Sequence, residues 1–448
     1  MIRLHIGIDD TDSPNGGCTT YIAALLIERL NDLGVKFLDY PNLIRLNPNV
    51  PWKTRGNGAL CLRVKCESSL IWKIEDAVLE VIEENADLMY EGTEPGVVFF
   101  FGDVPEEIEM FSEMALKGIV NMKMALDLIK KYNAEAYGFN DGRGIIGGLA
   151  AIGNLLKNDH TYEILAYRLS ENRGTKRRIV ASSVFEMDRK TGTQTFNNVD
   201  PDTGRILITP RGPDPVLFGI RGENPDILRQ AFKMIVSEEP IERWVIFRTN
   251  QGTDAHLFRV RAIKDVKPFC PVIVRGVVSE KPKVIQGGHV IFTIKDDSGE
   301  IDCAAYEPTG TLCNVCRRLL VGDVIEAYGG VRPPSQIRPL TINLEKLKII
   351  DLVPGIVYVN PSCPKCGKRM KSMGKNKGFR CKSCGYRGPQ MKKITKIIER
   401  KIKPGLYITA PRSQRHLTKP FSRYGLEKKH GAFTIGDVIP YNELCGSR

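Results

Sequence analysis

Three carboxylates lie within four positions of the N-terminal segment GIDDTDSPNGGCTT, residues 7–20: Asp9, Asp10 and Asp12. They directly follow an apolar strand, RLHIGI, and α/β sheets hold their ligands at the carboxyl ends of strands. Oxygen ligands grouped in a loop suit Mg²⁺, which binds through one or two carboxylates, waters and substrate phosphates. The pattern therefore favours a magnesium site over an Asx turn whose acids are solvated.

The residues after the acids are of the types that contact phosphate groups. Gly16 and Gly17 let the backbone approach a ligand closely, and Thr19 and Thr20 begin the helix TTYIAALLIERLNDLG. The N-terminus of a helix attracts phosphate through its unpaired N–H groups and its dipole. Acids, metal and helix N-terminus together predict phosphoryl transfer, and the alternative is a threonine that merely caps the helix.

Two further glycine-bearing loops follow the acids. KTRGNGA (53–59) leads into the strand ALCLRVKC and could hold nucleotide phosphates opposite the acids, although a tight turn explains its glycines equally well. The residues expected to bind phosphate there are Lys53, Arg55, Gly56, Asn57 and Gly58. FNDGRGIIGG (139–148) opens a helix with Arg143 at its mouth, and tight helix packing explains its paired glycines at least as well as a phosphate does.

Four of the twelve cysteines form two CxxC pairs with fourteen residues between them. This is the spacing of a zinc ribbon, in which each pair supplies two thiolates to one tetrahedral ion. The predicted zinc ligands are Cys363, Cys366, Cys381 and Cys384. A further pair, Cys313 and Cys316, lies in the apolar run TLCNVCRRLL without partners, and we interpret it as helix packing.

The basic residues are concentrated at one end of the chain. Of the 65 Lys and Arg residues, 22 lie in residues 363–448 beside only 4 acidic ones, whereas residues 1–362 hold 43 basic and 48 acidic residues. A strongly basic end indicates a polyanion-binding surface, and the interleaved aromatics Phe379 and Tyr386 suit nucleic acid, although packing within the ribbon is the alternative that we expect for one of the two. The ribbon residues expected to contact RNA are Lys365, Lys368, Arg369, Lys371, Arg380, Lys382 and Arg387.

The first two blocks of the chain differ in plan. Residues 1–125 alternate strands and helices, which predicts an α/β layer domain. Residues 126–265 have the order β-α-β-β-α-β of a ferredoxin-like domain, with EAYGFN, YEILAYR, IVASSVFEM and ERWVIFRT as its strands. The stretch 188–223 is too long for a simple connection.

Asp254 and His256, in TNQGTDAH, could be catalytic, but we prefer to interpret that motif as a polar linker.

The second half of the chain predicts smaller units. Five alternating strands in residues 266–352, with a helix between the third and fourth, match an OB-fold barrel. Residues 353–390 form the zinc ribbon, and residues 391–448 form a basic C-terminal extension.

No stretch approaches the ~20 apolar residues that span a membrane, and the acidic start does not resemble a signal peptide, so we expect a cytoplasmic protein that contacts no membrane.

Taken together, these motifs resemble one known family. GIDDTDSPNGGCTTY, KTRGNGA, GRGIIGGLAAIG with HTYEILAYR, GPDPVLFGIRG, NQGTDAH, the OB-fold and the zinc ribbon occur in the order typical of archaeal tRNA(Ile) 2-agmatinylcytidine synthetases. The resemblance covers essentially the whole chain. It implies a multidomain fold of α/β and α+β type, with a kinase-like ATP-binding domain, a ferredoxin-like domain, an OB-fold and a zinc ribbon.

The resemblance also implies a reaction and its cofactors. The family uses ATP to phosphorylate the C2 oxygen of the wobble cytidine in an isoleucine tRNA with a CAU anticodon, and agmatine then displaces the phosphate, so that the anticodon reads AUA. It implies ATP with Mg²⁺ at Asp9, Asp10 and Asp12, and Thr19 as the phosphorylated threonine, with Thr20 the neighbouring alternative. The candidate carboxylates for the agmatine guanidinium are Glu163, Asp200, Asp202 and Asp214.

Two other functions compete with this one. A non-catalytic single-strand-binding protein would explain residues 268–448 but would leave residues 9–20 without a role. A metal-dependent phosphohydrolase or nuclease could use the same three acids, and it would act without agmatine.

Overall fold

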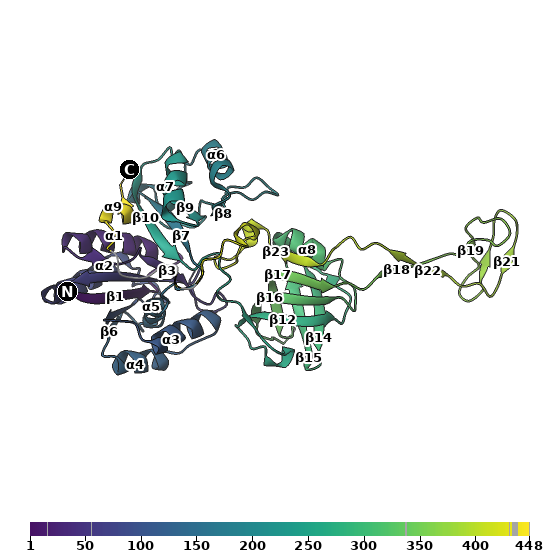
Figure 1. Cartoon of the computed structure of the whole chain (residues 1–448), viewed down its shortest axis with the longest axis horizontal. Helices are drawn as coiled ribbons and strands as arrows, with labels where there is room; N and C mark the ends of the chain where they lie inside the picture. Colours follow the sequence, from purple (N-terminus) through teal and green to yellow (C-terminus); the bar gives the residue numbers. More distant parts are fainter. Residues whose placement is uncertain (16, 55, 337, 430, 432–437, 448) are drawn as a thin grey trace.

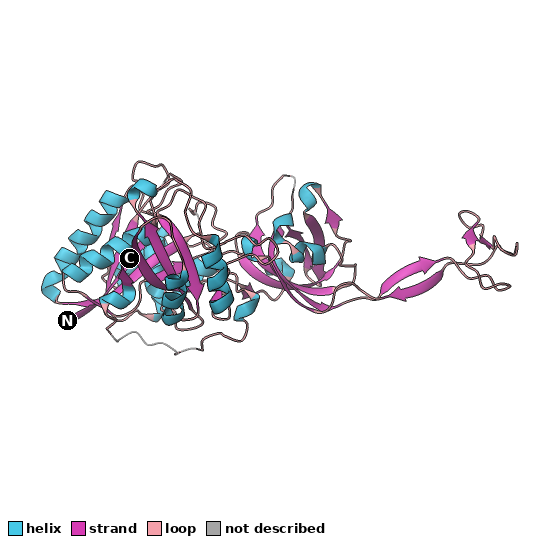
Figure 2. Ribbon diagram, turned by 90° about the horizontal axis from the view of Figure 1, so that it is seen from above, coloured by secondary structure: helices cyan, strands magenta, loops and turns pink. Residues whose placement is uncertain are grey.

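The computed structural model describes residues 1–448 apart from 16, 55, 337, 430, 432–437 and 448. A helix-covered sheet, a barrel, and a narrow stalk with a small tip follow one another along the long axis of the molecule (Figure 1). The view turned by 90° shows the same three parts in the same order (Figure 2). No helix of the described residues is long and apolar enough to cross a membrane.

The N-terminal unit runs to the end of α5. Its strands are β1 (Ile2–Asp9), β2 (Lys36–Phe37), β3 (Asn42–Arg45), β4 (Gly58–Cys66), β5 (Gly96–Phe101) and β6 (Glu135–Gly138). Its α-helices are α1 (Thr19–Asp32), α2 (Ile71–Asn85), α3 (Glu106–Lys117), α4 (Met122–Lys131) and α5 (Gly144–Gly153). β1 pairs antiparallel with both β4 and β5, so the acids lie at the end of an antiparallel strand.

The second unit has the ferredoxin-like order. It consists of β7 (Thr161–Arg168), α6 (Ala181–Thr191), β8 (Thr195–Phe196), β9 (Val216–Gly222), α7 (Pro225–Met234) and β10 (Ile241–Thr249). The strands lie in the order β10-β7-β9-β8, all antiparallel. The predicted ferredoxin-like fold is therefore present, but it is built from partly different segments.

One of its predicted strands belongs to the N-terminal unit, and another is a helix. EAYGFN contains β6, which pairs with β5, and the helix after it, α5, packs on β1, so both belong to the N-terminal unit. IVASSVFEM is mostly the helix α6, because Val184, Met187 and Thr191 recur at helical spacing and face the core. The stretch 188–223 instead supplies β8 and β9.

One sheet joins the two units. β3 pairs parallel with β10, which gives eleven strands with the order β6-β5-β1-β4-β3-β10-β7-β9-β8 along the main path. Residues of α1, α2, α6 and α7 share one apolar core with one face of this sheet. Residues of α3, α4 and α5 form a second core with the opposite face of the N-terminal half.

The barrel confirms the predicted OB-fold. β12 (Pro271–Val278), β14 (Val290–Asp296), β15 (Gly299–Ala305), β16 (Val324–Arg332) and β17 (Thr341–Asp351) form a ring that the β12–β14 pairing closes, and α8 (Thr311–Cys316) lies between β15 and β16 in the chain. Short strands β11 (Phe258–Arg259) and β13 (Lys283–Val284) extend its edges. Cys313 and Cys316 are buried in its core, as expected for helix packing.

The stalk is a two-stranded ribbon of β18 (Gly355–Val359) and β22 (Ile394–Ile398), paired from Gly355 with Ile398 to Val359 with Ile394. It carries a tip of three two-residue strands, β19 (Lys371–Ser372), β20 (Phe379–Arg380) and β21 (Arg387–Gly388). Phe379 is buried among the cysteines there, with Tyr386 packed against it.

The predicted C-terminal extension is not a free tail. β22 returns along the stalk, and β23 (Gly405–Ile408) pairs with β17 of the barrel. The chain then runs back to the first body, by which we mean the N-terminal and ferredoxin-like units joined by their common sheet. There β24 (Cys445–Gly446) pairs with β10 and α9 (Tyr441–Leu444) packs on it (Figure 1). We call residues 409–428 the return segment, because it connects the barrel to the two N-terminal units.

Buried histidines make the folded state sensitive to acid. Burial, with a contribution from Arg63, lowers the pKa of His5 to about 3, and burial lowers that of His160 to about 4. Because both values lie below 6.5, the unfolded state binds more protons, and stability should fall as the pH falls below 6.5. We expect losses of up to about 1.4 kcal/mol per pH unit for each histidine.

Thermal unfolding measured from pH 7 to pH 4.5 tests this expectation. A His5→Gln variant, whose amide can still accept from Arg63, should show a shallower dependence of Tm on pH than the unmodified protein. Equal dependence in the two proteins would contradict the role of His5.

Candidate functional site

A cavity of about 460 Å³ lies between the N-terminal unit and the ferredoxin-like unit. Its lining brings together most of the predicted site residues, namely Asp9, Asp10, Asp12, Thr19, Thr20, Lys53, Gly56, Asn57, Gly58, Glu163 and Asp214. Gly17 instead lines a neighbouring cavity of about 280 Å³. Gly16 and Arg55 lie outside the described residues.

The acids are held by the elements around the end of β1. Asp9 lies against α5, whose Gly147 leaves the space that its carboxylate occupies: a Cβ there would lie 1.8 Å from Asp9 Oδ2. Asp10 has a φ of 60°, a conformation rare outside glycine, and its Oδ2 accepts from Arg143 Nη2 at 2.8 Å. Asp12 Oδ1 accepts from Thr54 at 2.6 Å. The two loops that sequence analysis treated separately thus meet here.

Burial makes the charged forms of Asp9 and Asp10 unfavourable. Burial, with the neighbouring Asp10 charge, raises the pKa of Asp9 to about 8. Burial also raises the pKa of Asp10, against the opposing effect of Arg143. A divalent ion would remove these penalties by neutralising the carboxylates. Within the described part of the chain, only the ribbon cysteines meet the distances of a complete protein metal cage, so an ion at the acids would depend on phosphate or water ligands as well.

The two threonines differ in their surroundings. We call the segment that holds Asp9, Asp10 and Asp12 the acid loop. Thr19, the first residue of α1, accepts a hydrogen bond through Oγ1 from Thr11 of this loop at 3.0 Å. The Thr20 hydroxyl lies 3.0 Å from Cys18 Sγ. Both line the cavity, but Thr19 is the one tied to the acid loop.

Three basic residues that sequence analysis did not single out complete the lining: Arg45, Arg221 and His416. Arg45 ends β3, Arg221 lies on β9, and His416 comes from the return segment. His416 Nδ1 lies 2.9 Å from both Arg221 Nη2 and Gln251 Oε1. Burial and nearby cations hold the pKa of His416 well below its usual range, so its ring is neutral.

Only two of the four candidate guanidinium ligands reach the cavity. Glu163 accepts from Arg221 Nε at 3.0 Å, and Asp214 pairs with Arg177 at 3.2 Å. Asp200 and Asp202 are not among the lining residues of the described structure, since both pair with Arg412 of the return segment, at 2.9 and 3.2 Å. The structure therefore does not bring Asp200 and Asp202 to this cavity.

The NQGTDAH motif connects three parts of the chain. Asp254 pairs with Lys346 of β17, and its Oδ1 accepts from the backbone N–H of Lys419 at 2.7 Å. His256 Nε2 lies 3.1 Å from Glu345 Oε2, which also accepts from Thr418. Neither residue lines the cavity among the described residues, so the motif is a junction of the ferredoxin-like unit, the barrel and the return segment.

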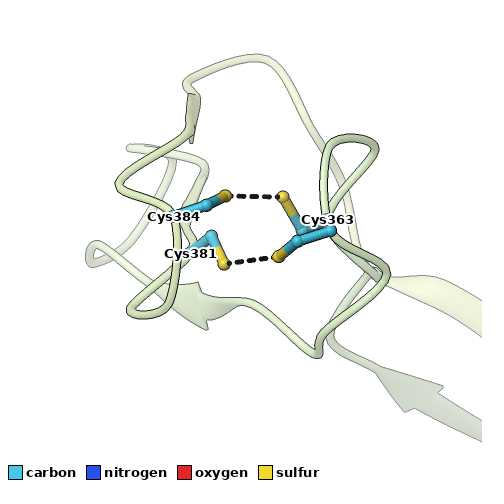
Figure 3. A group of neighbouring side chains, drawn as sticks. Cys363, Cys381 and Cys384 are labelled. Atoms are coloured by element: carbon cyan, nitrogen blue, oxygen red, sulfur yellow. Dashed lines mark hydrogen bonds between the residues drawn. The ribbon is translucent and has the colours of Figure 1, made fainter.

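The ribbon cysteines converge on one point (Figure 3). Their four sulfur atoms lie within 4.8 Å of one another, with Cys363 and Cys384 at 3.4 Å and Cys366 and Cys381 at 3.5 Å. A tetrahedral zinc with Zn–S bonds of about 2.3 Å requires sulfurs about 3.8 Å apart, so the geometry fits zinc. Backbone N–H groups, that of Cys384 foremost, lower the pKa of Cys381 to about 6, which favours the thiolate.

The basic side chains of the tip face solvent. All seven ribbon residues expected to contact RNA are exposed. The side-chain contact with Lys371, and then its positive charge, lower the pKa of Lys382. The return segment differs, because its cations are paired within the protein: buried Arg423 bonds Asp159 and Glu223, and Lys428 pairs with Glu223. Of these two segments, as far as the structure describes them, it is therefore the tip that presents unpaired basic side chains to solvent.

Comparisons with known proteins agree with this architecture. Family models match along the chain in this order: the TiaS TCKD domain at residues 5–141, the TiaS FLD domain at 142–256, an OB-fold nucleic acid binding domain at 272–350, and the TiaS C-terminal zinc ribbon domain at 360–402. The tRNA(Ile2) 2-agmatinylcytidine synthetase TiaS of Staphylothermus marinus is 44% identical, over 98% of each chain. That of Thermococcus sibiricus is 46% identical, over 94% of this chain and 96% of its own. The chain belongs to the TiaS family.

Solved TiaS structures share the fold of this member of the family. A TiaS–tRNA(Ile2)–ATP complex superposes with a TM-score of 0.85 at 41% identity, over 94% of this chain and 98% of the other. A TiaS–tRNA(Ile2)–AMPCPP–agmatine complex has a TM-score of 0.82 at 38% identity, over 94% and 98%. A ZRD-deleted TiaS mutant in complex with agmatine has a TM-score of 0.72 at 33% identity, over 94% and 97%.

Proposed function

We propose that this TiaS family member uses ATP to join agmatine to C2 of the wobble cytidine of tRNA(Ile2), giving 2-agmatinylcytidine. One observation carries the proposal: a single cavity joins the acid loop and Thr19 to the carboxylates Glu163 and Asp214 on the opposite unit. Such a cavity can receive a phosphoryl donor and a dicationic amine together. We further propose that the enzyme works in the cytoplasm, since its substrate is a tRNA.

Phosphorylation makes the cytosine reactive. A phosphoryl group passes from ATP to the C2 oxygen, so that a P–O bond to the nucleotide breaks and a new P–O bond forms. The primary amine of agmatine then attacks C2 and loses a proton, and the C2–O bond breaks as phosphate leaves with that oxygen. The cytosine carbonyl, a poor electrophile, thereby acquires a leaving group.

Different residues of the cavity would bind ATP and agmatine. We propose that Asp9, Asp10 and Asp12 hold Mg²⁺ with ATP, and that the 53–58 loop contacts the nucleotide phosphates. Mg²⁺ would neutralise charge on the transferred phosphoryl group. Glu163 and Asp214 would receive the agmatine guanidinium, whose charge-assisted hydrogen bonds match a carboxylate. The target base must leave its stack to enter the cavity.

The barrel and tip would bind the tRNA. We propose that the four cysteines hold zinc, which fixes the tip, and that its exposed cations neutralise tRNA phosphates. The acid loop and cavity, which a purely RNA-binding protein would not need, favour catalysis over that alternative.

We propose that the domain boundaries lie near those expected from the sequence, with one change. The N-terminal, ATP-binding domain extends past residue 125 to the end of α5, because β6 pairs with β5 and α5 packs on β1. The ferredoxin-like domain then begins with β7, and the residues after β22 belong partly to the barrel and partly to the first body.

Thr19 is expected to be the threonine that accepts phosphate. Because its hydroxyl bonds Thr11 in the acid loop while the Thr20 hydroxyl lies against Cys18 Sγ, Thr19→Val should abolish ATP-dependent phosphate incorporation into the protein. Thr20→Val should retain it. Intact-protein mass spectrometry after incubation with ATP checks both variants, and phosphate on Thr20 alone would contradict the assignment.

The function itself is tested on tRNA(Ile2) incubated with the protein, ATP and agmatine. Nucleoside mass spectrometry should show 2-agmatinylcytidine in the transcript with cytidine at position 34 and none in a transcript with uridine there. RNA cleavage without agmatine would instead support the phosphohydrolase alternative, and unmodified, intact RNA would refute the proposal.

A further inference from the structure

The Arg45 guanidinium occupies a site that two glycines create. Arg45 ends β3 directly across from Gly58 of β4. A Cβ added at Gly58 would lie 2.8 Å from Arg45 Nη1, and one added at Gly56 would lie 2.7 Å from it and 2.8 Å from His416 Nε2. The small residues of KTRGNGA therefore make room for this side chain. Its backbone is fixed as well, since Arg45 N–H and C=O both bond the Asn250 amide, at 2.8 and 2.9 Å.

Arg45 differs from the other cavity arginines in lacking an acidic partner. Arg143 pairs with Asp10 at 2.8 Å, and Arg221 pairs with Glu163 at 3.0 Å. Among the described residues no carboxylate forms an ion pair with Arg45, and its buried Nε has no hydrogen-bond partner. Holding a guanidinium in this state is unfavourable for the free protein, so the arrangement is suited to an anionic ligand.

The position of Arg45 indicates which anion it meets. Arg45 ends β3, the strand of the N-terminal unit that pairs with β10 of the ferredoxin-like unit, so it lines the cavity where the two units meet. A phosphoryl group that leaves a nucleotide at the acids for a base bound near Glu163 would pass this point. Guanidinium presents paired donors that match phosphoryl oxygens.

We propose that Arg45 is a catalytic residue that binds the transferred phosphoryl group as it moves to the cytosine C2 oxygen and while it remains there. This inference rests on the proposed function. Arg45 donates N–H bonds to non-bridging oxygens while the P–O bond to the nucleotide breaks and the bond to O2 forms. It keeps those bonds when the amine nitrogen bonds to C2 and phosphate departs, and it stays protonated throughout.

The test compares Arg45→Gln and Arg45→Lys with the unmodified protein. We expect Arg45→Gln to lower kcat for 2-agmatinylcytidine formation about 10²–10³-fold, as loss of a transition-state donor does, with Arg45→Lys recovering part of it. The KM for ATP and the Kd for tRNA(Ile2) should change less than about threefold, since Arg45 acts on the moving group.

If Arg45 instead bound a phosphate of the tRNA backbone or of the nucleotide, the kinetic constants would change differently. A raised Kd for tRNA with unchanged kcat would assign Arg45 to a backbone phosphate, and a raised KM for ATP with unchanged kcat would assign it to the nucleotide. Either outcome overturns the proposal, as does an Arg45→Gln variant of normal activity. Failure of the unmodified protein to form product would refute the proposed function, which separates the two claims.

A second variant covers the case in which Arg45→Gln fails to fold. Gly58→Ala keeps the charge but displaces the far end of the Arg45 side chain, so we expect kcat to fall about tenfold with Tm unchanged. Gly299→Ala is the matched control, because the nearest atom to its added carbon is 4.0 Å away, in the barrel. Equal kcat in Gly58→Ala and Gly299→Ala would contradict the role of Arg45.

Discussion

Replacement of Asp12 by asparagine should lower agmatine incorporation into tRNA(Ile2) by about 10²–10³-fold. The substitution is nearly isosteric, and the asparagine oxygen can still accept from Thr54, which bonds Asp12 Oδ1 at 2.6 Å. What it removes is the negative charge that we assign to the Mg²⁺–ATP site. Product formation measured at saturating ATP and agmatine gives the loss in kcat.

The control is Asp297→Asn, which neutralises an exposed carboxylate on the barrel. Asp297→Asn should have normal kcat, and both variants should bind tRNA(Ile2) as the unmodified protein does. If Asp12→Asn kept full activity, or lost activity only in proportion to tRNA affinity, the acid loop would not be the phosphoryl-transfer site.

Removal of the ribbon tip should raise the Kd for tRNA(Ile2) at least about 100-fold at moderate salt. The strand register of the stalk shows where to make the deletion. Val359 pairs with Ile394, so a two-residue Asn-Gly turn can join them in place of residues 360–393. That segment holds eleven Lys and Arg residues and no acid. Filter binding across a salt series should also show a shallower slope of log Kd against log salt, since fewer counterions are released.

This excision leaves the remainder of the protein in place. Deletion of residues 363–448 would also remove β23, which pairs with the barrel, and His416, which lines the cavity. After the shorter excision, ATP binding and Tm of the main body should be unchanged. Unchanged tRNA affinity would show that the barrel or the first body, and not the tip, supplies most of the phosphate contacts.

The barrel and the zinc ribbon could be predicted because short stretches of sequence specify them. The strands of the barrel alternate apolar and polar residues, and the ribbon ligands follow a fixed spacing, so both were predicted from short windows of sequence. β9 was missed because proline and glycine flank VLFGIRG, while the β-branched residues of IVASSVFEM concealed the helical spacing of Val184 and Met187. Tertiary packing decides such segments.

The candidate site was predicted only on its acidic side. Asp9, Asp10 and Asp12 are close enough in sequence to form a motif, whereas the basic residues of the lining, Arg45, Arg221 and His416, come from three distant segments. No local pattern connects them. The charge count likewise could not separate the exposed cations of the tip from Arg423, which is buried between Asp159 and Glu223.

The central claim is that the cavity turns the C2 oxygen of cytidine 34 into a phosphate leaving group. The most direct measurement uses tRNA(Ile2) with ¹⁸O at that oxygen, incubated with the protein, ATP and agmatine, followed by mass spectrometry of the released phosphate. Our account predicts one ¹⁸O atom in phosphate for each 2-agmatinylcytidine formed. Product formation with the ¹⁸O found in water would contradict it, because the oxygen would then have left without phosphorylation.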